Sequence, residues 1–232
     1  MKNIIFDVDD TLYNLMEPFE KAHKDVMEDK TDADCEELFK ASRTYSDEAF
    51  YLSREGKLSK DEEFIYRIRK TYGDVGVDVS KEEADRFEER YRYYQKHIHV
   101  PELTAKLLDH CKENYRIGIL TNGTAKNQGK KLSTLGLSKW FDEEVMFISD
   151  NIGATKPDVR AFKAVQEAMN LDPEETWFIG DTFEIDVIGA KNAGWHVIWY
   201  NHRNRPMPEG DIKPDIEVKD EEELFQVIFD LG

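Results

Sequence analysis

The sequence has few cysteines and no long apolar run. Its 232 residues include only Cys35 and Cys111, whose separation matches neither a metal-binding motif nor a disulfide framework. This scarcity favours a reducing compartment and two buried, inert thiols. Nowhere do about 20 consecutive apolar residues occur, the length that a membrane-spanning helix needs. The apolar run in the opening MKNIIFDVDD is too short for a signal peptide, so we expect a soluble, cytoplasmic protein.

Basic residues are also in short supply. The chain has 32 Lys and Arg against 49 Asp and Glu, a formal net charge of -17 at pH 7. This charge opposes attraction to nucleic acid and to an anionic membrane surface, so we exclude both as main partners. It also repels small anions, so a site for an anionic metabolite needs cations concentrated locally.

Short apolar runs that end in small or polar residues are plentiful. They have the length of buried strands. The later runs are separated by helical stretches, such as 101–114, 160–170 and 186–193. The runs are Asn3–Asp7, Arg116–Thr121, Val145–Ser149, Trp177–Asp181 and His196–Tyr200. This alternation predicts an α/β fold in which helices flank a parallel, Rossmann-like sheet.

Residues 14–99 interrupt this alternation. The stretch has helical periodicity, heavy charge and almost no strand-like run. Capping-box patterns at Ser59 to Glu62 and Ser80 to Glu83 indicate helices near 58–72 and 80–97. We therefore predict an α/β core formed by residues 1–13 and 100–232, with an inserted helical domain at residues 14–99.

Acidic residues follow two of the predicted strands. Asp7 and Asp9 come at the end of the first, and Asp181 ends the fourth, with Asp186 five residues further on. Parallel α/β sheets bind ligands beyond the carboxyl ends of their strands, so the fold would bring these residues together. Crowded carboxylates raise one another's pKa unless a cation intervenes. Oxygen-only ligands favour Mg²⁺ over zinc, with calcium a possibility.

Four motifs carry a resemblance to a known family. Phe6-Asp7-Val8-Asp9-Asp10-Thr11-Leu12 is similar to the first motif of the haloacid dehalogenase superfamily. The other elements follow in that family's order: Thr121-Asn122, Lys156-Pro157-Asp158, and Gly180-Asp181-Thr182 with Asp186, Gly189 and Ala190. One DxD is weak evidence, but four ordered elements at the ends of predicted strands are strong. The resemblance implies a Mg²⁺-dependent phosphatase whose helical insert is a cap domain.

The resemblance also implies two catalytic residues. Asp7 would be the nucleophile that forms an aspartyl phosphate, which divides one difficult displacement into two easier ones. Asp9 would protonate the departing oxygen and then activate the hydrolytic water. That second role needs a proton near neutral pH, so we predict that neighbouring carboxylates raise the pKa of Asp9.

The remaining matched residues would bind the metal and the phosphate. No organic cofactor is needed for this chemistry. The implied metal ligands are the Asp7 and Asp181 carboxylates and the Asp9 main-chain carbonyl, with Asp186 supporting the metal's waters. The implied phosphate-binding groups are the Thr121 hydroxyl, the Asn122 backbone N–H and the Lys156 ammonium.

Several neighbours of these motifs have simpler interpretations. Asp10 can serve only as a turn residue, and Asp158 can cap the helix after Pro157. Gly189 and Ala190 are typical of helix packing. Lys126, Lys130 and Lys131 are interpreted as solvated charges on a helix that begins near Gly123.

The substrate is less defined than the reaction. Asp9 argues against dehalogenation, which needs no acid two residues after the nucleophile. A helical insert directly after the first motif suggests a lid that admits a small phosphorylated metabolite, a nucleotide or sugar phosphate. Runs 120–123 and 149–158 look most like the branch containing pyrimidine 5′-nucleotidases, with phosphoglycolate phosphatases close behind. A mutase of the β-phosphoglucomutase kind and a non-catalytic binding protein on the same fold remain as alternatives, and the oligomeric state is open.

Overall fold

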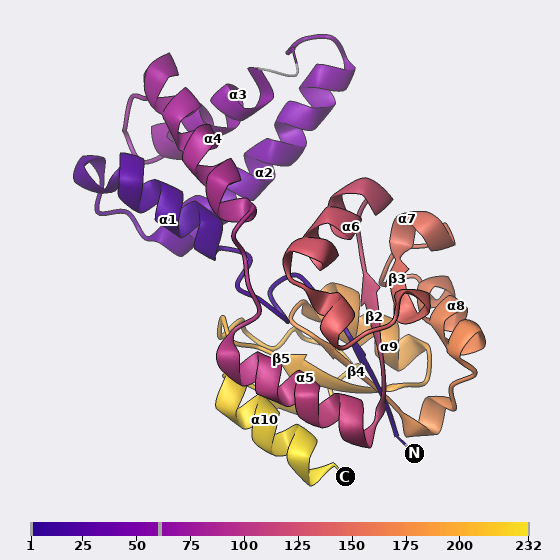
Figure 1. The fold of residues 1–232 in the computed structure, drawn as a ribbon. Helices are drawn as coiled ribbons and strands as arrows, with labels where there is room; N and C mark the ends of the chain where they lie inside the picture. Colours follow the sequence, from indigo (N-terminus) through magenta and orange to yellow (C-terminus); the bar gives the residue numbers. More distant parts are fainter. Residues whose placement is uncertain (1, 60–61, 232) are drawn as a thin grey trace. The chain divides into compact units, whose positions relative to one another are not determined.

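The chain folds as two compact units. The computed structural model describes residues 2–59 and 62–231, and Figure 1 shows the elements in chain order. The first unit, called the α/β unit here, comprises Met1–Asn14 and His99–Gly232. The second, the helical unit, comprises Leu15–Ile98 and lies within the insertion predicted at residues 14–99.

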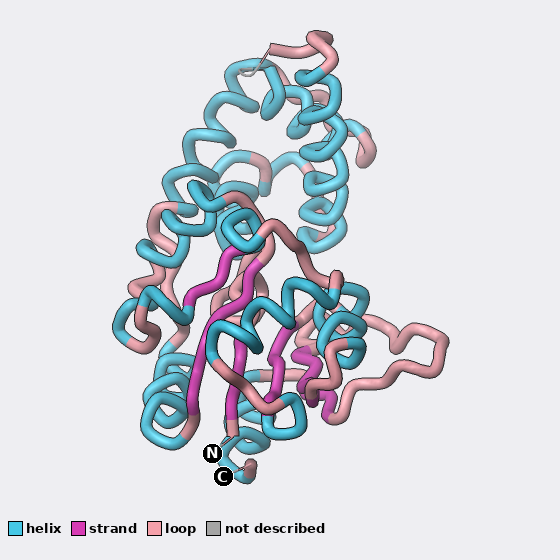
Figure 2. Tube along the Cα trace, turned by 90° about the vertical axis from the view of Figure 1, so that its right-hand side faces the viewer, coloured by secondary structure: helices cyan, strands magenta, loops and turns pink. Residues whose placement is uncertain are grey.

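A parallel six-stranded sheet forms the centre of the α/β unit, in the order β3-β2-β1-β4-β5-β6. Figure 2 shows these strands between helices. The strands are β1 (Asn3–Phe6), β2 (Arg116–Thr121), β3 (Met146–Ile148), β4 (Thr176–Gly180), β5 (His196–Tyr200) and β6 (Ile216–Val218). The Rossmann-like sheet is confirmed, and the first five strands match the predicted runs to within one residue at each end. The three-residue β6 was missed because it is too short to show a pattern.

Helices cover both faces of this sheet. Ile5, Leu120 and Phe178 point from neighbouring strands into one apolar cluster, which also holds Phe162 of α8 and Ala190 of α9. Side chains alternate along a strand, so the residues next to these three face the opposite side of the sheet. On that side α5 contacts β2 and packs beside α10 (Figure 1). The helices are α5 (Glu102–Asn114), α6 (Ala125–Thr134), α7 (Ser149–Ile152), α8 (Val159–Met169), α9 (Ile188–Asn192) and α10 (Glu221–Asp230).

The helical unit has its own aromatic core. Phe19, Tyr72 and Phe87 are fully buried or nearly so, and their rings meet edge to face at centroid distances of 5.2 and 5.9 Å. The helices are α1 (Glu17–Val26), α2 (Cys35–Arg54), α3 (Glu62–Gly73) and α4 (Lys81–Gln95). A separate core of this kind is what allows the insertion to fold as a compact unit.

The two predicted capping boxes lie at the starts of α3 and α4. At the start of α4 the Ser80 hydroxyl and the Glu83 carboxylate accept each other's backbone N–H, as predicted. At the start of α3 the Ser59 N–H donates to the Glu62 carboxylate at 2.8 Å. Residues 60 and 61 of that predicted helix lie outside the described residues, and α3 begins at Glu62.

The two cysteines agree in part with the expectation of buried, inert thiols. Cys111 is buried, as predicted, whereas Cys35 is only half-buried. Burial raises the pKa of Cys111 to about 12 and that of Cys35 to about 11, so both thiols resist ionisation. Within the described ranges, none of the helices combines the length and apolar character that a membrane span requires.

Candidate active site

Neighbouring strands bring two of the predicted acidic residues together. Asp7 directly follows β1 and Asp181 directly follows β4, and these strands pair in parallel. The Asp7 N–H donates to the Ile179 carbonyl at 2.8 Å, which continues the ladder one residue past β1. The carboxyl ends of β1 and β4 thus hold Asp7 and Asp181 at the same edge of the sheet.

A π-helix, Phe183–Val187, delivers a third carboxylate to this edge. Asp186 lies on it, and its Oδ2 accepts the Thr182 N–H at 3.0 Å. Gly180 makes room for it, because a Cβ at that position would lie 2.4 Å from the Asp186 carboxylate. Helices of this wide type are rare and are often found at functional sites.

The three carboxylates form a compact, buried group. One oxygen each from Asp7, Asp181 and Asp186 lies within 4.8 Å of the others. The Lys156 ammonium contacts Asp7 Oδ1 and Asp186 Oδ1, both at 2.7 Å, and its side chain is only 2% exposed. One buried lysine therefore contacts two of the three acids.

The pKa values of this group indicate that its negative charge is only partly neutralised. Burial, with the Asp186 charge adding to it, raises the pKa of Asp7 to about 7 even though Lys156 acts against it. Burial and the Asp186 and Asp7 charges raise the pKa of Asp181 to about 8. Burial alone would lower the pKa of Lys156, but Asp186 and Asp7 outweigh it and raise that pKa. The group therefore favours an added cation strongly.

The donor set fits a hard divalent cation. Its atoms are carboxylate oxygens, which Mg²⁺, Ca²⁺ and Mn²⁺ prefer, and it includes no sulfur or imidazole. Asp186 belongs to the group itself, so its position allows it to contact an ion directly as well as to support the metal's waters. Asp7, Asp181 and Asp186 are thus the side chains that could hold the ion.

The end of β2 lies beside this group. Asn122 and Lys156 exchange two hydrogen bonds of 2.9 Å, one from the Asn122 amide to the Lys156 carbonyl and one from the Lys156 N–H back to Asn122 Oδ1. Asn122 therefore fixes the loop that carries Lys156, a contact that sequence reasoning missed. The Thr121 hydroxyl is buried and has no hydrogen-bond partner within residues 2–59 and 62–231, so it is available to a ligand.

Asp9 has a different environment from the one we expected. Its carboxylate accepts hydrogen bonds from the Tyr13 hydroxyl at 2.6 Å, the Gln128 amide at 3.1 Å and the Lys131 ammonium at 2.6 Å. Burial opposes its ionisation, but the Lys131 charge and these hydrogen bonds outweigh burial and lower the pKa of Asp9. The predicted rise was wrong because the nearest charge is a lysine, not a carboxylate.

Lys131 corrects a second prediction. We interpreted it as a solvated helix charge, yet its side chain is 20% exposed and forms an ion pair with Asp9. The sequence offered one clue. Gln128 and Lys131 are three residues apart on α6, so both can face the same neighbour.

Asp10 does more than form a turn. Its φ of 60° is in the left-handed region, as a turn residue can be. Its buried carboxylate also accepts two hydrogen bonds from Arg203, at 2.6 and 2.7 Å. This fork-to-fork pair joins the first motif to the loop after β5.

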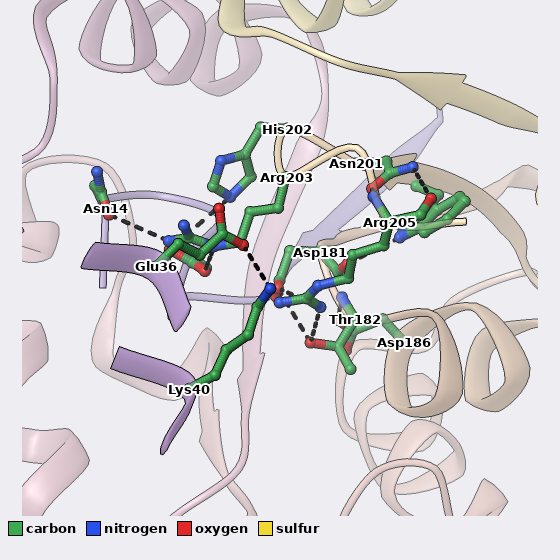
Figure 3. A network of polar contacts seen from close by, with 12 residues as sticks. Asn14, Glu36, Lys40, Asp181, Thr182, Asp186, Asn201, His202, Arg203 and Arg205 are labelled. Atoms are coloured by element: carbon green, nitrogen blue, oxygen red, sulfur yellow. Dashed lines mark hydrogen bonds and ion pairs between the residues drawn. The ribbon is translucent and has the colours of Figure 1, made fainter. Parts of the chain in front are cut away.

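The loop after β5 adds a second arginine that sequence reasoning missed. Arg205 Nη1 lies 3.4 Å from Asp181 Oδ2 and 3.5 Å from the Thr182 hydroxyl, and Figure 3 shows its guanidinium directed at both. The Asn201 side chain holds the loop through the Arg205 N–H and carbonyl, at 2.8 and 2.9 Å. Two arginines within three residues were the only clue in the sequence.

The remaining motif residues have the structural roles that we predicted. Asp158 caps α8, because its carboxylate accepts the Arg160 N–H at 2.9 Å. A Cβ at Gly189 would lie 2.4 Å from the Phe162 ring, so Gly189 allows α9 to pack against α8. Neither residue belongs to the carboxylate group.

Comparison with known proteins identifies the family. The model of the haloacid dehalogenase-like hydrolases matches residues 1–194. The chain belongs to this family, as the resemblance of its four motifs implied.

Individual relatives differ in what they act on. Pyrimidine 5'-nucleotidase YjjG of Escherichia coli K12 is 37% identical over 123 residues, 53% of either chain. A glyceraldehyde 3-phosphate phosphatase of Methanothermobacter thermautotrophicus is 38% identical over 101 residues, 44% of either chain. The chain thus spans about half the length of these relatives.

One solved structure is similar over nearly the whole chain. It is the putative hydrolase YfnB of Bacillus subtilis, crystallised with bound magnesium and showing interdomain movement. Its TM-score is 0.68 and its sequence identity 25%, and the match covers 98% of each chain.

Proposed function

We propose that this chain is a Mg²⁺-dependent phosphatase that hydrolyses small phosphate monoesters through an aspartyl phosphate on Asp7. The observation that carries the proposal is the buried group of Asp7, Asp181 and Asp186 with Lys156 between two of them. Such a costly cluster of buried charge is typical of an active site. The family and the phosphatase relatives support the reaction type.

In the first step Asp7 attacks phosphorus. A bond forms between an Asp7 carboxylate oxygen and phosphorus while the bond from phosphorus to the ester oxygen breaks. Asp9 gives that oxygen a proton, so the leaving group departs as an alcohol. The ion pair with Lys131 favours the Asp9 carboxylate, so Asp9 must regain its acid form when the substrate binds.

In the second step water breaks the aspartyl phosphate. Asp9 accepts a proton from the water as its oxygen bonds to phosphorus, and the Asp7 oxygen is released as a carboxylate. Asp9 is ionised once it has given up its proton in the first step, and the ion pair with Lys131 favours that form. Thr121 and the Asn122 N–H would hold phosphoryl oxygens, and Lys156 would supply fixed positive charge beside Asp7.

Asp7, Asp181 and Asp186 would hold the Mg²⁺, with the Asp9 carbonyl as a further ligand. When bound, the ion neutralises charge between the nucleophile and the anionic phosphate. The relative crystallised with magnesium supports this choice of metal. The bound ion would also supply positive charge where the substrate binds. A chain with a net charge of -17 needs such local positive charge, because it otherwise repels anionic metabolites.

The helical unit is proposed to be the cap that selects the substrate. Its place in the chain supports this, since it begins directly after the first motif. The nucleotidase and the glyceraldehyde 3-phosphate phosphatase support two classes of substrate, pyrimidine nucleotides and three-carbon sugar phosphates. We propose a small metabolite of one of these classes.

The experiment is a substrate panel with a nucleophile variant. The purified chain and Asp7→Asn are incubated with Mg²⁺ and nucleotides, sugar phosphates or phosphoglycolate, and released phosphate is measured. The unmodified chain should release phosphate from at least one ester, and Asp7→Asn should lose at least about 10⁴-fold in rate. Asp142→Asn, an exposed residue of the same unit, should not change the rate.

Three outcomes would contradict the proposal. Isomerised sugar phosphate without phosphate release would indicate a mutase, in which the phosphoryl group returns to the sugar. No reaction with any ester would favour a non-catalytic binding protein. Release of phosphate by Asp7→Asn at the unmodified rate would remove Asp7 from the mechanism.

A further inference from the structure

We propose that Lys131, with Gln128, is a positioning residue that fixes the carboxylate of Asp9 for proton transfer. This inference rests on the proposed function and extends it to residues outside the family motifs. Both side chains come from α6, one turn apart, and both contact the Asp9 carboxylate. Neither one would touch the reacting atoms, so their effect would pass through Asp9.

The contacts leave Asp9 little freedom. Tyr13 donates to Oδ1 at 2.6 Å, Gln128 donates to Oδ2 at 3.1 Å, and the Lys131 ammonium contacts both oxygens. Donors from two segments more than a hundred residues apart thus define the position and the plane of the carboxylate. A fixed acid is valuable because a displacement of about 1 Å can cost roughly 10²-fold in rate.

Gln128 also connects Asp9 to the proposed phosphate-binding loop. Its amide nitrogen donates to the Asn122 carbonyl at 2.8 Å as well as to Asp9, and its side chain is buried. Gly123 permits this approach, since a Cβ there would lie 2.8 Å from the same nitrogen. The start of α6 therefore sets the distance between the proton-transfer group and the phosphoryl site.

Lys131 is the better residue to test because its side chain is partly exposed. In Lys131→Met the apolar stem is kept and the ammonium is lost. Lys131→Arg keeps a cation that can still pair with the carboxylate. The matched control is Lys130→Met, which removes an exposed lysine from the same helix.

The activity readout is kcat/KM for two esters of different leaving group. For p-nitrophenyl phosphate the phenolate leaves without help, whereas the best alkyl ester of the panel needs a proton from Asp9. Only steps up to leaving-group departure enter kcat/KM, so slow hydrolysis of the intermediate does not disturb it. Lys131→Met should lose about 10–100-fold on the alkyl ester and less than about 3-fold on the aryl ester.

The pattern of variants separates positioning from a general effect on structure. Lys131→Arg should restore most of the alkyl activity, and Lys130→Met should match the unmodified chain on both esters. An equal loss on both esters in Lys131→Met, or no loss on either, would overturn the proposal.

A second readout does not depend on activity. Crystal structures of the unmodified chain and of Lys131→Met show whether the Asp9 carboxylate keeps its place. We expect it to leave the Tyr13 and Gln128 donors or to occupy several rotamers in the variant. An unchanged Asp9 would overturn the proposal, whether or not the unmodified chain hydrolyses any ester. A chain that hydrolyses none would contradict the proposed function alone.

Discussion

Both units of this chain bury aromatic rings, but among the described residues the α/β unit alone also buries a group of like charges. At the site of the α/β unit, Asp7, Lys156 and Asp186 have side chains at most 9% exposed, and Asp181 is comparably buried. The helical unit buries aromatic rings, and most of its ion pairs, such as Lys30 with Glu83, lie at the surface. Arg67 with Glu88 is its one well-buried ion pair among the described residues.

This difference separates two uses of buried space. Burial of an aromatic ring stabilises a fold by removing apolar area from water. Burial of like charges costs free energy, and proteins keep such groups mainly where they serve chemistry. Changes in the helical unit should therefore act mainly on stability, and changes in the carboxylate group mainly on activity.

The largest effect on stability is expected in the aromatic core. Phe87 is completely buried between Phe19 and Tyr72, so Phe87→Ala should lower the free energy of unfolding by about 3–5 kcal/mol. Urea denaturation followed by circular dichroism measures this. Val75→Ala, at a residue that is 41% exposed, should stay within about 0.5 kcal/mol of the unmodified chain. A loss below about 1 kcal/mol for Phe87→Ala would contradict a packed core.

A substitution of Lys156 tests whether changes at the carboxylate group act mainly on activity. Lys156→Met removes the ammonium that contacts Asp7 and Asp186 but keeps an apolar chain of similar length. We expect kcat to fall by about 10²–10³-fold, because a fixed positive charge at the phosphoryl site is lost. The protein should remain folded in Mg²⁺, as near-UV circular dichroism can show. Retained turnover would remove Lys156 from the mechanism.

The fold was predictable because its causes are local. The first five strands are apolar runs with clear ends, and the Ser80 capping box depends on residues three apart. Asp7 and Asp181 could be grouped from the rule that ligands bind beyond the carboxyl ends of parallel strands, whereas Asp186 reaches them from the π-helix. That rule places Asp7 and Asp181 without any knowledge of the side-chain contacts.

The surroundings of Asp9 were not predictable, because they depend on contacts between residues far apart in the chain. Lys131 lies 122 residues from Asp9 in the chain, and whether it meets the carboxylate depends on the direction in which α6 leaves β2. In sequence, only its spacing of three residues from Gln128 distinguishes it from its exposed neighbour Lys130. The pKa of Asp9 follows from that single contact more than from the number of aspartates nearby.

Metal affinity should depend on pH through the carboxylate group. With pKa values raised to about 7 and about 8, Asp7 and Asp181 hold protons that the metal must displace. Affinity for Mg²⁺ should therefore rise as pH increases from 6 to 8, by up to about 10-fold per pH unit for each proton released. Titration calorimetry in buffers of different ionisation enthalpy measures both quantities. Asp181→Asn should flatten the dependence, and a flat profile in the unmodified chain would contradict the raised pKa values.

The smallest effect concerns His23, a buried histidine of the helical unit. Burial lowers the pKa of His23, which is hydrogen-bonded to the Tyr72 hydroxyl at 2.8 Å. The folded state disfavours the protonated ring, whereas the unfolded chain protonates it near its ordinary pKa of 6.5. His23 therefore favours folding above that pH, and stability should fall by at most about 1 kcal/mol as pH drops below it. Urea midpoints between pH 5 and pH 8 measure the change. His23→Phe should remove this part of the pH dependence, while the exposed His99→Gln should keep it; identical profiles for all three proteins would show that His23 protonates equally in both states.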